Sequence, residues 1–471
     1  MAAWRETKVS HSGFLKIKLL LSPLHGPDGR MSSGLNYSQC NRQARYGSER
    51  LINREQKVWK MLGKIMETRR MVDAKVTPHV MGGLTILRCF GLEKIPYFAV
   101  CATGDQRDDF IFASRYCQGG FVTADPANHP EKALAALLAH GKKLPHRVPL
   151  YYSNDQQLKL VSEHREPLSQ YFQFTMPEAA TITDTLDKSK FVQYCQRHDL
   201  PAPASYSEAE VAQKNRAGFA WQFPLVVKPA THINWFESNV IKSFGGLEYK
   251  AIIVNNQKEF SQVIAAMQQE KIPFLVQRFI AGGDDLIYSF HTFLDEKSEP
   301  LGWFIGKKIR TYPAVSGEST YLRLVRNDEL RDLAMALLKK IKFVGPVKLD
   351  FKQDAVDKQY YLLEINARYN LWHYLGASAG VNLPVNAYRY YTKSAPRAAT
   401  PEYRTDIRWL HFRQDVSAFF EYRRRGELSL GGWIGSLLCK KVYDKFAWRD
   451  PLPALAAAGG FIKSRVGRLV S

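Results

Sequence analysis

The segment "YYLLEINARYN" (residues 360–370) places an acid, an amide and a guanidinium at alternate positions. Side chains two positions apart share one face of a strand. Glu364, Asn366 and Arg368 are therefore predicted to line one face, and the apolar residues between them the other. Three polar groups in line on a strand that otherwise reads as buried indicate a site for a charged ligand, or else the outer face of a half-solvated sheet.

A second carboxylate, Asp350 in "VKLDF", precedes Glu364 by 14 residues. The intervening "KQDAVDKQ" (352–359) is short and polar, which predicts an antiparallel hairpin with Asp350 facing the same pocket as Glu364 and Asn366. Carboxylate and amide oxygens suit Mg²⁺, which takes only one or two carboxylates and completes its shell with phosphates and water. The set therefore predicts a site for a metal-bound nucleoside triphosphate.

Lysines upstream of this hairpin could neutralise the phosphates of such a nucleotide. Lys228 ends the strand-like "LVVK" (225–228), and a lysine at a strand end acts as a point charge on phosphate oxygens. Lys188 or Lys190 and Lys250 could add further positive charge. Taken one at a time, a lysine of this kind is more often a solvated surface residue than a phosphate ligand.

The segment "LVQRFIAGGDD" (275–285) has the features of an adenosine pocket. A short strand offers backbone groups to the edge of adenine, a glycine pair turns the chain, and Asp284 can then reach the ribose hydroxyls. A plain hairpin turn explains the same residues.

The composition places the chain among multidomain α/β proteins. It has 471 residues with 45% hydrophobic content, enough for two or three cores, and its strand-like and helical stretches alternate. Six scattered cysteines form no CxxC or metal-like pair, which indicates free thiols in a cytoplasmic protein. No apolar run approaches the ~20 residues of a spanning helix, and we identify no signal peptide.

The net charge of +21 is concentrated at the two ends of the chain. Residues 1–75 hold 15 Lys/Arg against 6 Asp/Glu, and residues 391–471 hold 15 against 7. Basic ends can contact nucleic acid or an anionic membrane, but no RNA-binding or helix-turn-helix signature accompanies them, so nucleic acid is not expected. Peripheral contact with an anionic membrane stays open as a possibility. The segment "GELSLGGWIGSLLCKKVYDKFAW" (426–448) could be an amphipathic segment that lies in the membrane interface, or it could pack against the body of the protein.

We predict four parts in the chain. Residues 1–75 read as a basic, disordered extension, 76–185 as a small α/β domain, 186–390 as the nucleotide-binding domain, and 391–471 as a basic helical tail.

The ordered series of Lys188, Lys228, "VQRFIAGGDD", Asp350 and the Glu364-x-Asn366-x-Arg368 strand resembles the ATP-grasp superfamily. Within it, the chain resembles carboxylate–amine ligases related to the carbamoyl-phosphate synthase large chain and to D-aspartate ligase. The resemblance spans about residues 76–390. "FASRYC" (112–117) and "GKKIRTYP" (306–313) also resemble segments of this subgroup.

The resemblance implies a fold of α/β and α+β type. Two α+β lobes would clasp ATP, after a small Rossmann-like pre-ATP-grasp domain. It also implies roles for individual residues: phosphate contacts from Lys188, Lys228 and, third, Lys250; adenine contacts from Gln277, Phe279 and Ile280; a ribose contact from Asp284; one or two Mg²⁺ (or Mn²⁺) on Asp350, Glu364 and Asn366; and binding of the reacting carboxylate or acyl phosphate by Arg368 and Arg310.

The implied activity is ATP-dependent amide formation from a small-molecule carboxylate and an amine, through an acyl phosphate, by a protein that could be a homodimer. ATP-grasp chemistry without an amine acceptor, or nucleotide binding without catalysis, remain alternatives. The chain departs from relatives at three places: Gln277 stands where many have Glu, residues 230–249 lack a small Ser/Gly phosphate loop, and "YNLWHYLG" (369–376) follows Arg368. Tyr369, Trp372 and His373 could therefore shape the acceptor pocket.

Overall fold

The computed structural model describes residues 76–102, 109–230, 238–244, 251–314, 317–394 and 402–457. The predicted N-terminal extension (1–75) and Lys250 lie outside these residues. The described cysteines form no disulfide, as predicted, while Cys40 is not described. Among the helices of the described ranges, none is long and apolar enough to cross a membrane.

The first part of the described chain is a five-stranded parallel sheet in the order β3-β2-β1-β4-β5. This is the Rossmann-like arrangement that the sequence predicts. Gly83, in the turn after β1, has φ 76°, and a Cβ there would meet Ser153 Oγ at 3.1 Å, so the turn requires glycine. The elements are β1 (His79–Met81), α2 (Leu84–Leu92), β2 (Tyr97–Ala102), η1 (Asp109–Ala113), β3 (Cys117–Thr123), α3 (Pro130–Gly141), β4 (Val148–Tyr152), α4 (Asp155–Glu163), α5 (Arg165–Ser169) and β5 (Phe172–Gln173).

Two helices, α6 (Ala179–Leu186) and α7 (Lys188–Arg197), lead into a small four-stranded antiparallel sheet in the order β6-β9-β7-β8. Its helices begin at side-chain caps: Ser207 and Glu210 form a capping box on α8, and Asn256 accepts from the Glu259 backbone N–H on α10. The elements are β6 (Ser205–Ser207), α8 (Glu208–Arg216), β7 (Leu225–Pro229), α9 (Asn239–Phe244), β8 (Ile252–Val254), α10 (Gln257–Gln269) and β9 (Phe274–Arg278).

A seven-stranded sheet in the order β14-β13-β10-β11-β12-β15-β16 follows, antiparallel except between β15 and β16. Helix α11 covers it with a face of Leu330, Ala334 and Leu337, the spacing of an amphipathic helix. The elements are η3 (Asp284–Leu286), β10 (Ile287–Leu294), β11 (Pro300–Tyr312), β12 (Glu318–Val325), α11 (Asp328–Lys340), β13 (Gly345–Gln353), β14 (Tyr360–Asn366), α12 (His373–Ser378) and α13 (Leu383–Tyr391).

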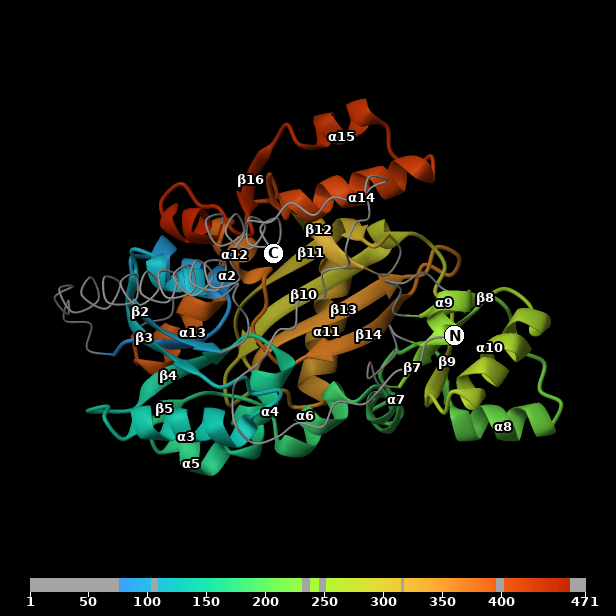
Figure 1. Cartoon of the computed structure of the whole chain (residues 1–471), viewed down its shortest axis with the longest axis horizontal. Helices are drawn as coiled ribbons and strands as arrows, with labels where there is room; N and C mark the ends of the chain where they lie inside the picture. Colours follow the sequence, from blue (N-terminus) through green and yellow to red (C-terminus); the bar gives the residue numbers. More distant parts are fainter. Residues whose placement is uncertain are drawn as a thin grey trace, which may run out of the picture. The chain divides into compact units, whose positions relative to one another are not determined.

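One hydrophobic core joins the parallel sheet to the large antiparallel sheet. It contains Met81 and Leu150 from the first and Phe290 and Leu349 from the second, each at most 2% exposed. The small sheet has its own core, centred on Val227, Phe260 and Met267. Figure 1 shows the small sheet with α8 and α10 at one end of the large sheet, so two separately packed lobes meet there.

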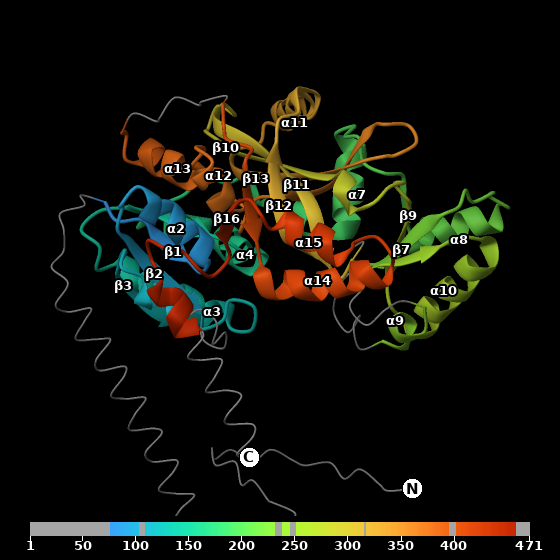
Figure 2. The ribbon, with the colours of Figure 1, turned by 90° about the horizontal axis from the view of Figure 1, so that it is seen from above.

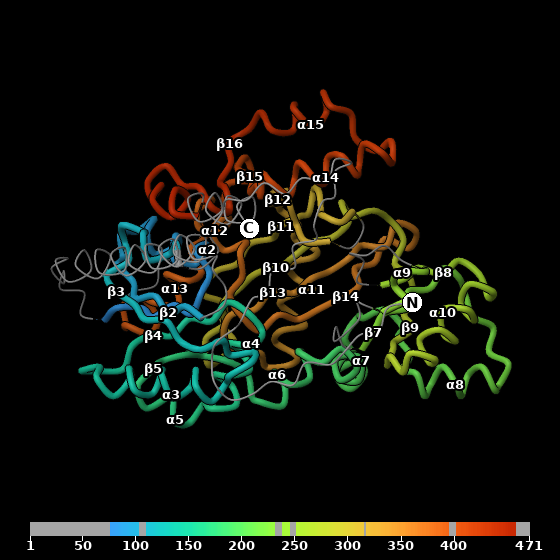
Figure 3. The backbone as a smooth tube through the Cα atoms, in the orientation of Figure 1, coloured from blue at the N-terminus to red at the C-terminus, as the bar shows by residue number. Residues whose placement is uncertain are grey.

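The predicted helical tail is helical only in part. It contains α14 (Phe412–Arg424) and α15 (Leu430–Ser436), but also β15 (Ile407–Leu410) and β16 (Lys440–Tyr443), which extend the large sheet beyond β12. Figure 2 shows α14 and α15 beside this sheet, and Figure 3 traces the tail from β15 out through the two helices and back to β16. Four-residue strands are too short to show a period of two, so the sequence pattern missed them.

Candidate active site

A cavity of about 1110 Å³ lies where the two antiparallel sheets meet. The small sheet contributes Lys228 and Gln277, the large sheet contributes Asp350 and Glu364, and the tail contributes Arg425. The volume is at the upper end of the range for small-molecule sites, which leaves room for a nucleotide and a second reactant.

Asp350 and Glu364 lie directly opposite each other on β13 and β14, which pair in antiparallel register. The predicted hairpin is thereby confirmed. Opposed residues of paired strands point to the same face, and both carboxylates line the cavity. The irregularity in register immediately after Asp350 lies next to this pair.

Asp350 is buried, and two neighbours satisfy its carboxylate. Ser289 Oγ donates a hydrogen bond from the facing position on β10, and Lys348 Nζ forms an ion pair at 2.7 Å. Burial by itself would raise the pKa of Asp350, but the positive charges of Lys348 and then Lys308 hold it below its ordinary value. The group therefore remains ionised, as a ligand for a divalent cation must be.

Asn366, the third predicted metal ligand, lies two residues beyond Glu364 at the end of β14 and is not among the residues that line the cavity. Its side chain is buried, and its Nδ2 has no hydrogen-bond partner among the described residues. The amide can therefore turn its oxygen toward a cation without losing a bond, and two carboxylates with one amide fit Mg²⁺. No group of three or more His, Cys, Asp or Glu that could hold a metal occurs in the part of the chain that the structure describes, so the proposed set depends on oxygens supplied by phosphate and water.

Lys228 points from β7 into the cavity, where its Nζ donates a hydrogen bond to Gln277 Oε1 at 3.1 Å. Gln277 Nε2 in turn donates to Ser205 Oγ at 2.7 Å, so the amide orientation is fixed. Burial lowers the pKa of Lys228, and the negative charge of Glu364 partly opposes this shift. An anionic ligand beside Lys228 would supply the counter-charge that this buried ammonium needs.

The residues predicted to contact adenine line the same cavity. Gln277 lies near the end of β9, and Phe279 and Ile280 follow the strand. Lys352 Nζ lies 5.2 Å from the centroid of the Phe279 ring and also lines the cavity. Lys188 enters from the first turn of α7, with its Nζ 3.4 Å from the Pro229 carbonyl oxygen.

Arg368 follows β14 and does not line the cavity itself. Its Nε donates to Asp155 Oδ1 at 2.5 Å, and Asp155 is a lining residue from the parallel domain. This ion pair joins the segment that follows β14 to the first turn of α4, at the rim of the cavity.

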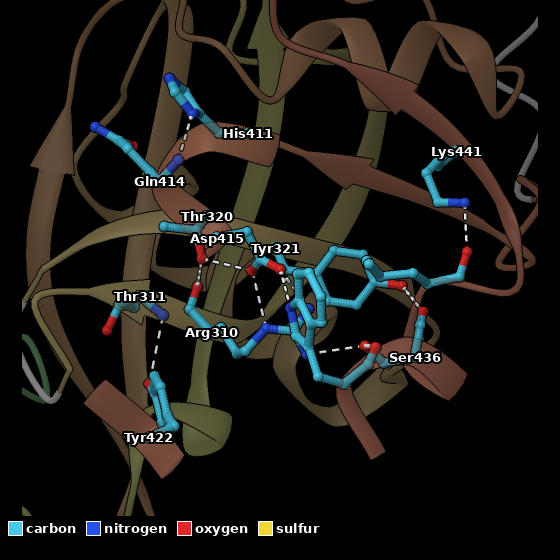
Figure 4. Close-up of polar contacts among 12 residues, drawn as sticks. Arg310, Thr311, Thr320, Tyr321, His411, Gln414, Asp415, Tyr422, Ser436 and Lys441 are labelled. Carbon is cyan, nitrogen blue, oxygen red and sulfur yellow. Dashed lines mark hydrogen bonds and ion pairs between the residues drawn. The ribbon is translucent and has the colours of Figure 1, made fainter. Parts of the chain in front are cut away.

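Two predicted site residues lie among tail residues instead of lining the cavity. Asp284 Oδ2 accepts hydrogen bonds from Thr311 Oγ1 at 2.5 Å and from Tyr422 Oη at 2.8 Å. Arg310 forms a bidentate, buried ion pair with Asp415 of α14, with both bonds at 2.8 Å (Figure 4). The ribose role of Asp284 and the acyl-phosphate role of Arg310 gain no support from these positions.

The residues predicted to shape an acceptor pocket are in the core. Tyr369 packs against Tyr151, and the His373 ring lies between Tyr369 and His291. Burial lowers the pKa of His373 to about 4. None of these side chains lines the cavity.

The sequence analysis did not identify several positively charged side chains at or beside the cavity. Lys348 and Lys352 alternate with Asp350 on β13, and this period of two in "KLDFK" was a readable signal. Lys308 lies on β11 within the "GKKIRTYP" segment. Arg425, from the end of α14, had no local signal because it reaches the cavity only through the docking of the tail.

Two lobes around a charged cavity, preceded by a Rossmann-like parallel sheet, make up the ATP-grasp fold, and the chain has this fold. It resembles the carboxylate–amine ligases of that superfamily. No family model matches the chain.

Comparison with known proteins supports this placement. The chain is 25% identical over 282 residues to D-aspartate ligase of Enterococcus faecium (strain Aus0004), which covers 58% of this chain and 66% of the relative, just under two thirds of its length. The crystal structure of an L-amino acid ligase from Bacillus licheniformis aligns with a TM-score of 0.51 and 14% identity, over 71% of this chain and 78% of that one. The second similarity supports the fold alone.

Proposed function

We propose that this chain is an ATP-dependent carboxylate–amine ligase that forms an amide through an acyl-phosphate intermediate. The observation that carries the proposal is the direct opposition of Asp350 and Glu364 on the wall of a cavity that the half-buried Lys228 also lines. The similarity to D-aspartate ligase supports the same class of reaction.

Asp350, Glu364 and Asn366 are the residues that would hold one or two Mg²⁺, with Mn²⁺ as the alternative. When bound, the metal would neutralise charge on the phosphates of ATP. Lys188 and Lys228 would bind phosphate oxygens, and Gln277, Phe279 and Ile280 would lie along adenine. Because phosphoryl transfer requires charge neutralisation and alignment more than covalent help, these residues act by positioning.

Arg368 would hold the substrate carboxylate at the rim, since its planar fork matches a carboxylate, and its ion pair with Asp155 orients the guanidinium. A carboxylate oxygen attacks the γ-phosphorus of ATP, and the bond from that phosphorus to the β–γ bridging oxygen breaks, releasing ADP. The amine then attacks the carbonyl carbon of the acyl phosphate. Its carbon–oxygen bond to phosphate breaks, inorganic phosphate leaves, and the amine loses one proton to solvent.

The substrates of this reaction are a small-molecule carboxylate and a small-molecule amine. The comparisons provide no identity for either one in this chain. A homodimer and a cytoplasmic location remain predictions.

The test measures ADP formation by the purified chain with Mg·ATP, against pooled amino acids and small carboxylates as donors and acceptors. Glu364→Gln should lose turnover while retaining the fold by circular dichroism. Glu163→Gln, a half-exposed carboxylate on α4 outside the cavity, is the matched control and should match the unchanged protein.

Hydroxylamine detects the intermediate, because an acyl phosphate reacts with it to give a hydroxamate. A requirement for an amine in product formation then distinguishes the amide ligase from a ligase with another acceptor. Hydroxamate formed only with ATP and a carboxylate supports the proposal. ADP release without hydroxamate or amide indicates phosphorylation without ligation. Wild-type turnover by Glu364→Gln contradicts the metal assignment.

A further inference from the structure

Large apolar side chains are exposed along the C-terminal tail. Trp448 is 86% exposed and Leu438 is 82% exposed, which are unusual values for side chains of this size. Most of the strongly exposed apolar residues in the described ranges belong to this tail: Phe412, Phe420, Leu430, Ile434, Leu438, Trp448, Leu452 and Leu455. Apolar exposure concentrated in one segment marks an interaction surface.

Hydrogen bonds hold the backbone in place on both sides of Trp448 in the sequence. Arg88 of α2 donates hydrogen bonds to the carbonyls of Tyr443, Asp444 and Lys445. On the other side, Asp450 accepts from Ser114 Oγ at 2.7 Å and from the Arg115 backbone N–H at 2.9 Å. The exposure of Trp448 is therefore built into the fold and does not come from a loose chain end.

Leu438 follows α15, a helix with no buried residue and no charged side chain. Its position is also fixed, because Tyr321 Oη donates to the Ser436 carbonyl and Lys441 Nζ to that of Leu437. Strand β16, at the edge of the large sheet, connects Leu438 to the Trp448 segment. In Figure 1, α14, α15 and β16 lie together along one side of that sheet.

Basic residues flank both apolar tips. Lys440 follows Leu438 and forms an exposed ion pair with Asp406 at 3.4 Å. Lys445 and Arg449 bracket Trp448, and both are exposed. The acids nearest Trp448 are paired or withdrawn: Asp444 pairs with His411, and Asp450 is buried against Ser114. Two exposed acids of the tail, Asp406 and Glu427, pair with arginines. The exposed surface therefore combines apolar side chains with positive charge.

We propose that the tail surface around Leu438 and Trp448, which we call the tail tips, binds the interface of an anionic phospholipid bilayer. Tryptophan and leucine favour the boundary between headgroups and acyl chains, and lysine and arginine beside them attract acidic headgroups. Charge complementarity selects this occupant over a second copy of the chain, whose tail tips carry the same positive charge. The proposal does not depend on the ligase activity.

The test is co-sedimentation of the full chain, without ATP, with vesicles of phosphatidylcholine alone or of phosphatidylcholine with phosphatidylglycerol. The chain should bind the second and not the first. Lys445→Gln/Arg449→Gln should lower the partition coefficient by roughly thirtyfold, since each cation near the surface contributes about fivefold. Leu438→Ala/Trp448→Ala should also release the protein, because the apolar anchors are lost.

Matched control variants distinguish binding through the tail tips from nonspecific hydrophobic adsorption and from a general effect of the protein's charge. Val356 is 80% exposed in the loop between β13 and β14, and Val356→Ala should leave binding unchanged. Lys159→Glu, on the exposed side of α4, tests charge outside the tail. Absence of binding to anionic vesicles, or equal loss in tail and control variants, overturns the proposal. So does a change from dimer to monomer in Leu438→Ala/Trp448→Ala without vesicle binding, which would identify a surface for self-association.

Discussion

Replacing Asp415 should undock the tail and destabilise the chain more than any other aspartate substitution in the tail. Asp415 is fully buried and accepts four hydrogen bonds: two from Arg310 at 2.8 Å, one from Thr320 Oγ1 at 2.9 Å and one from Trp433 Nε1 at 2.8 Å (Figure 4). Arg310, only 4% exposed, has its counter-charge here.

The magnitude follows from what Asp415→Ala leaves behind. The guanidinium of Arg310 becomes a buried charge without a partner, and two neutral donors lose their acceptor. Removing one member of a buried ion pair costs about 3–5 kcal/mol of unfolding free energy. Removing both members in Arg310→Met/Asp415→Leu should cost less than the two single losses together, because no buried charge is left unpaired. What remains is the loss of the acceptor of Thr320 and Trp433, of the Ser436 hydrogen bond and of the stacking of Arg310 on Tyr321.

The assay is urea unfolding followed by circular dichroism, with proteolysis of the tail as a local readout. Asp406→Ala is the matched control in the same tail, because Asp406 pairs with Arg404 at 2.8 Å while both side chains are about half exposed. An ion pair that solvent screens in this way contributes little to stability. The double variant also tests Arg310 itself, since retained ligase turnover would leave Arg310 a structural role only.

Equal losses of stability in Asp415→Ala and Asp406→Ala would refute this reasoning. An Arg310→Met/Asp415→Leu double variant whose loss equals the sum of the single losses would refute it as well, because coupled buried charges are not additive.

Three further predictions concern the site and the parallel domain. Lys228→Met should weaken ATP binding by about tenfold or more in calorimetric titration, whereas the control Lys159→Met should not. Burial lowers the pKa of Lys228. ATP binding by the wild-type chain should therefore weaken as the pH rises toward 10.5, and it should begin to weaken at a lower pH than it would with an ordinary lysine. Arg368→Lys should raise KM for the carboxylate and leave KM for ATP within about twofold in steady-state assays, since an ammonium cannot form the fork; equal rises in both would contradict the assignment. Burial lowers the pKa of His79 to about 3. Between about pH 6.5 and 3, this histidine is therefore protonated in the unfolded chain but neutral in the native chain, and the free energy of unfolding should fall as the pH drops through this range. His79→Phe, which can keep the stacking on Phe98, should reduce this dependence in pH-resolved thermal unfolding, while His146→Phe should not. The part that remains belongs to His373 and His291, whose pKa values burial also lowers.

The central hairpin of the candidate site was predictable because its contacts are local. Asp350 and Glu364 are joined by a short polar loop, so alternation and loop length together fix which side chains share a face. The parallel sheet was predictable for a similar reason, since its strands and helices alternate in short units. The same alternation placed Lys348 and Lys352 beside Asp350, although the sequence reasoning did not use it.

Asp284 and Arg310 were assigned to the nucleotide and the acyl group because the resemblance ended near residue 390. Their partners, Tyr422 and Asp415, lie in the tail, more than 100 positions along the chain. Nothing in the local pattern around "GGDD" or "KKIRTYP" distinguishes a carboxylate or guanidinium that binds substrate from one that binds another part of the chain. Only the pairing of β15 with β12 brings α14 over these residues.

This pairing makes the tail part of the body that forms the cavity. Helix α14 carries Asp415, which is locked to β11, and ends next to Arg425, which lines the cavity. The same docked segment continues through α15 to the tail tips at Leu438 and Trp448. Since the contacts of Arg310, Arg88 and Asp450 hold this path in place, a bilayer bound at the tail tips would hold the cavity at a fixed orientation to the membrane. The undocking variant Asp415→Ala should therefore weaken vesicle binding as well as stability, although it changes no exposed residue.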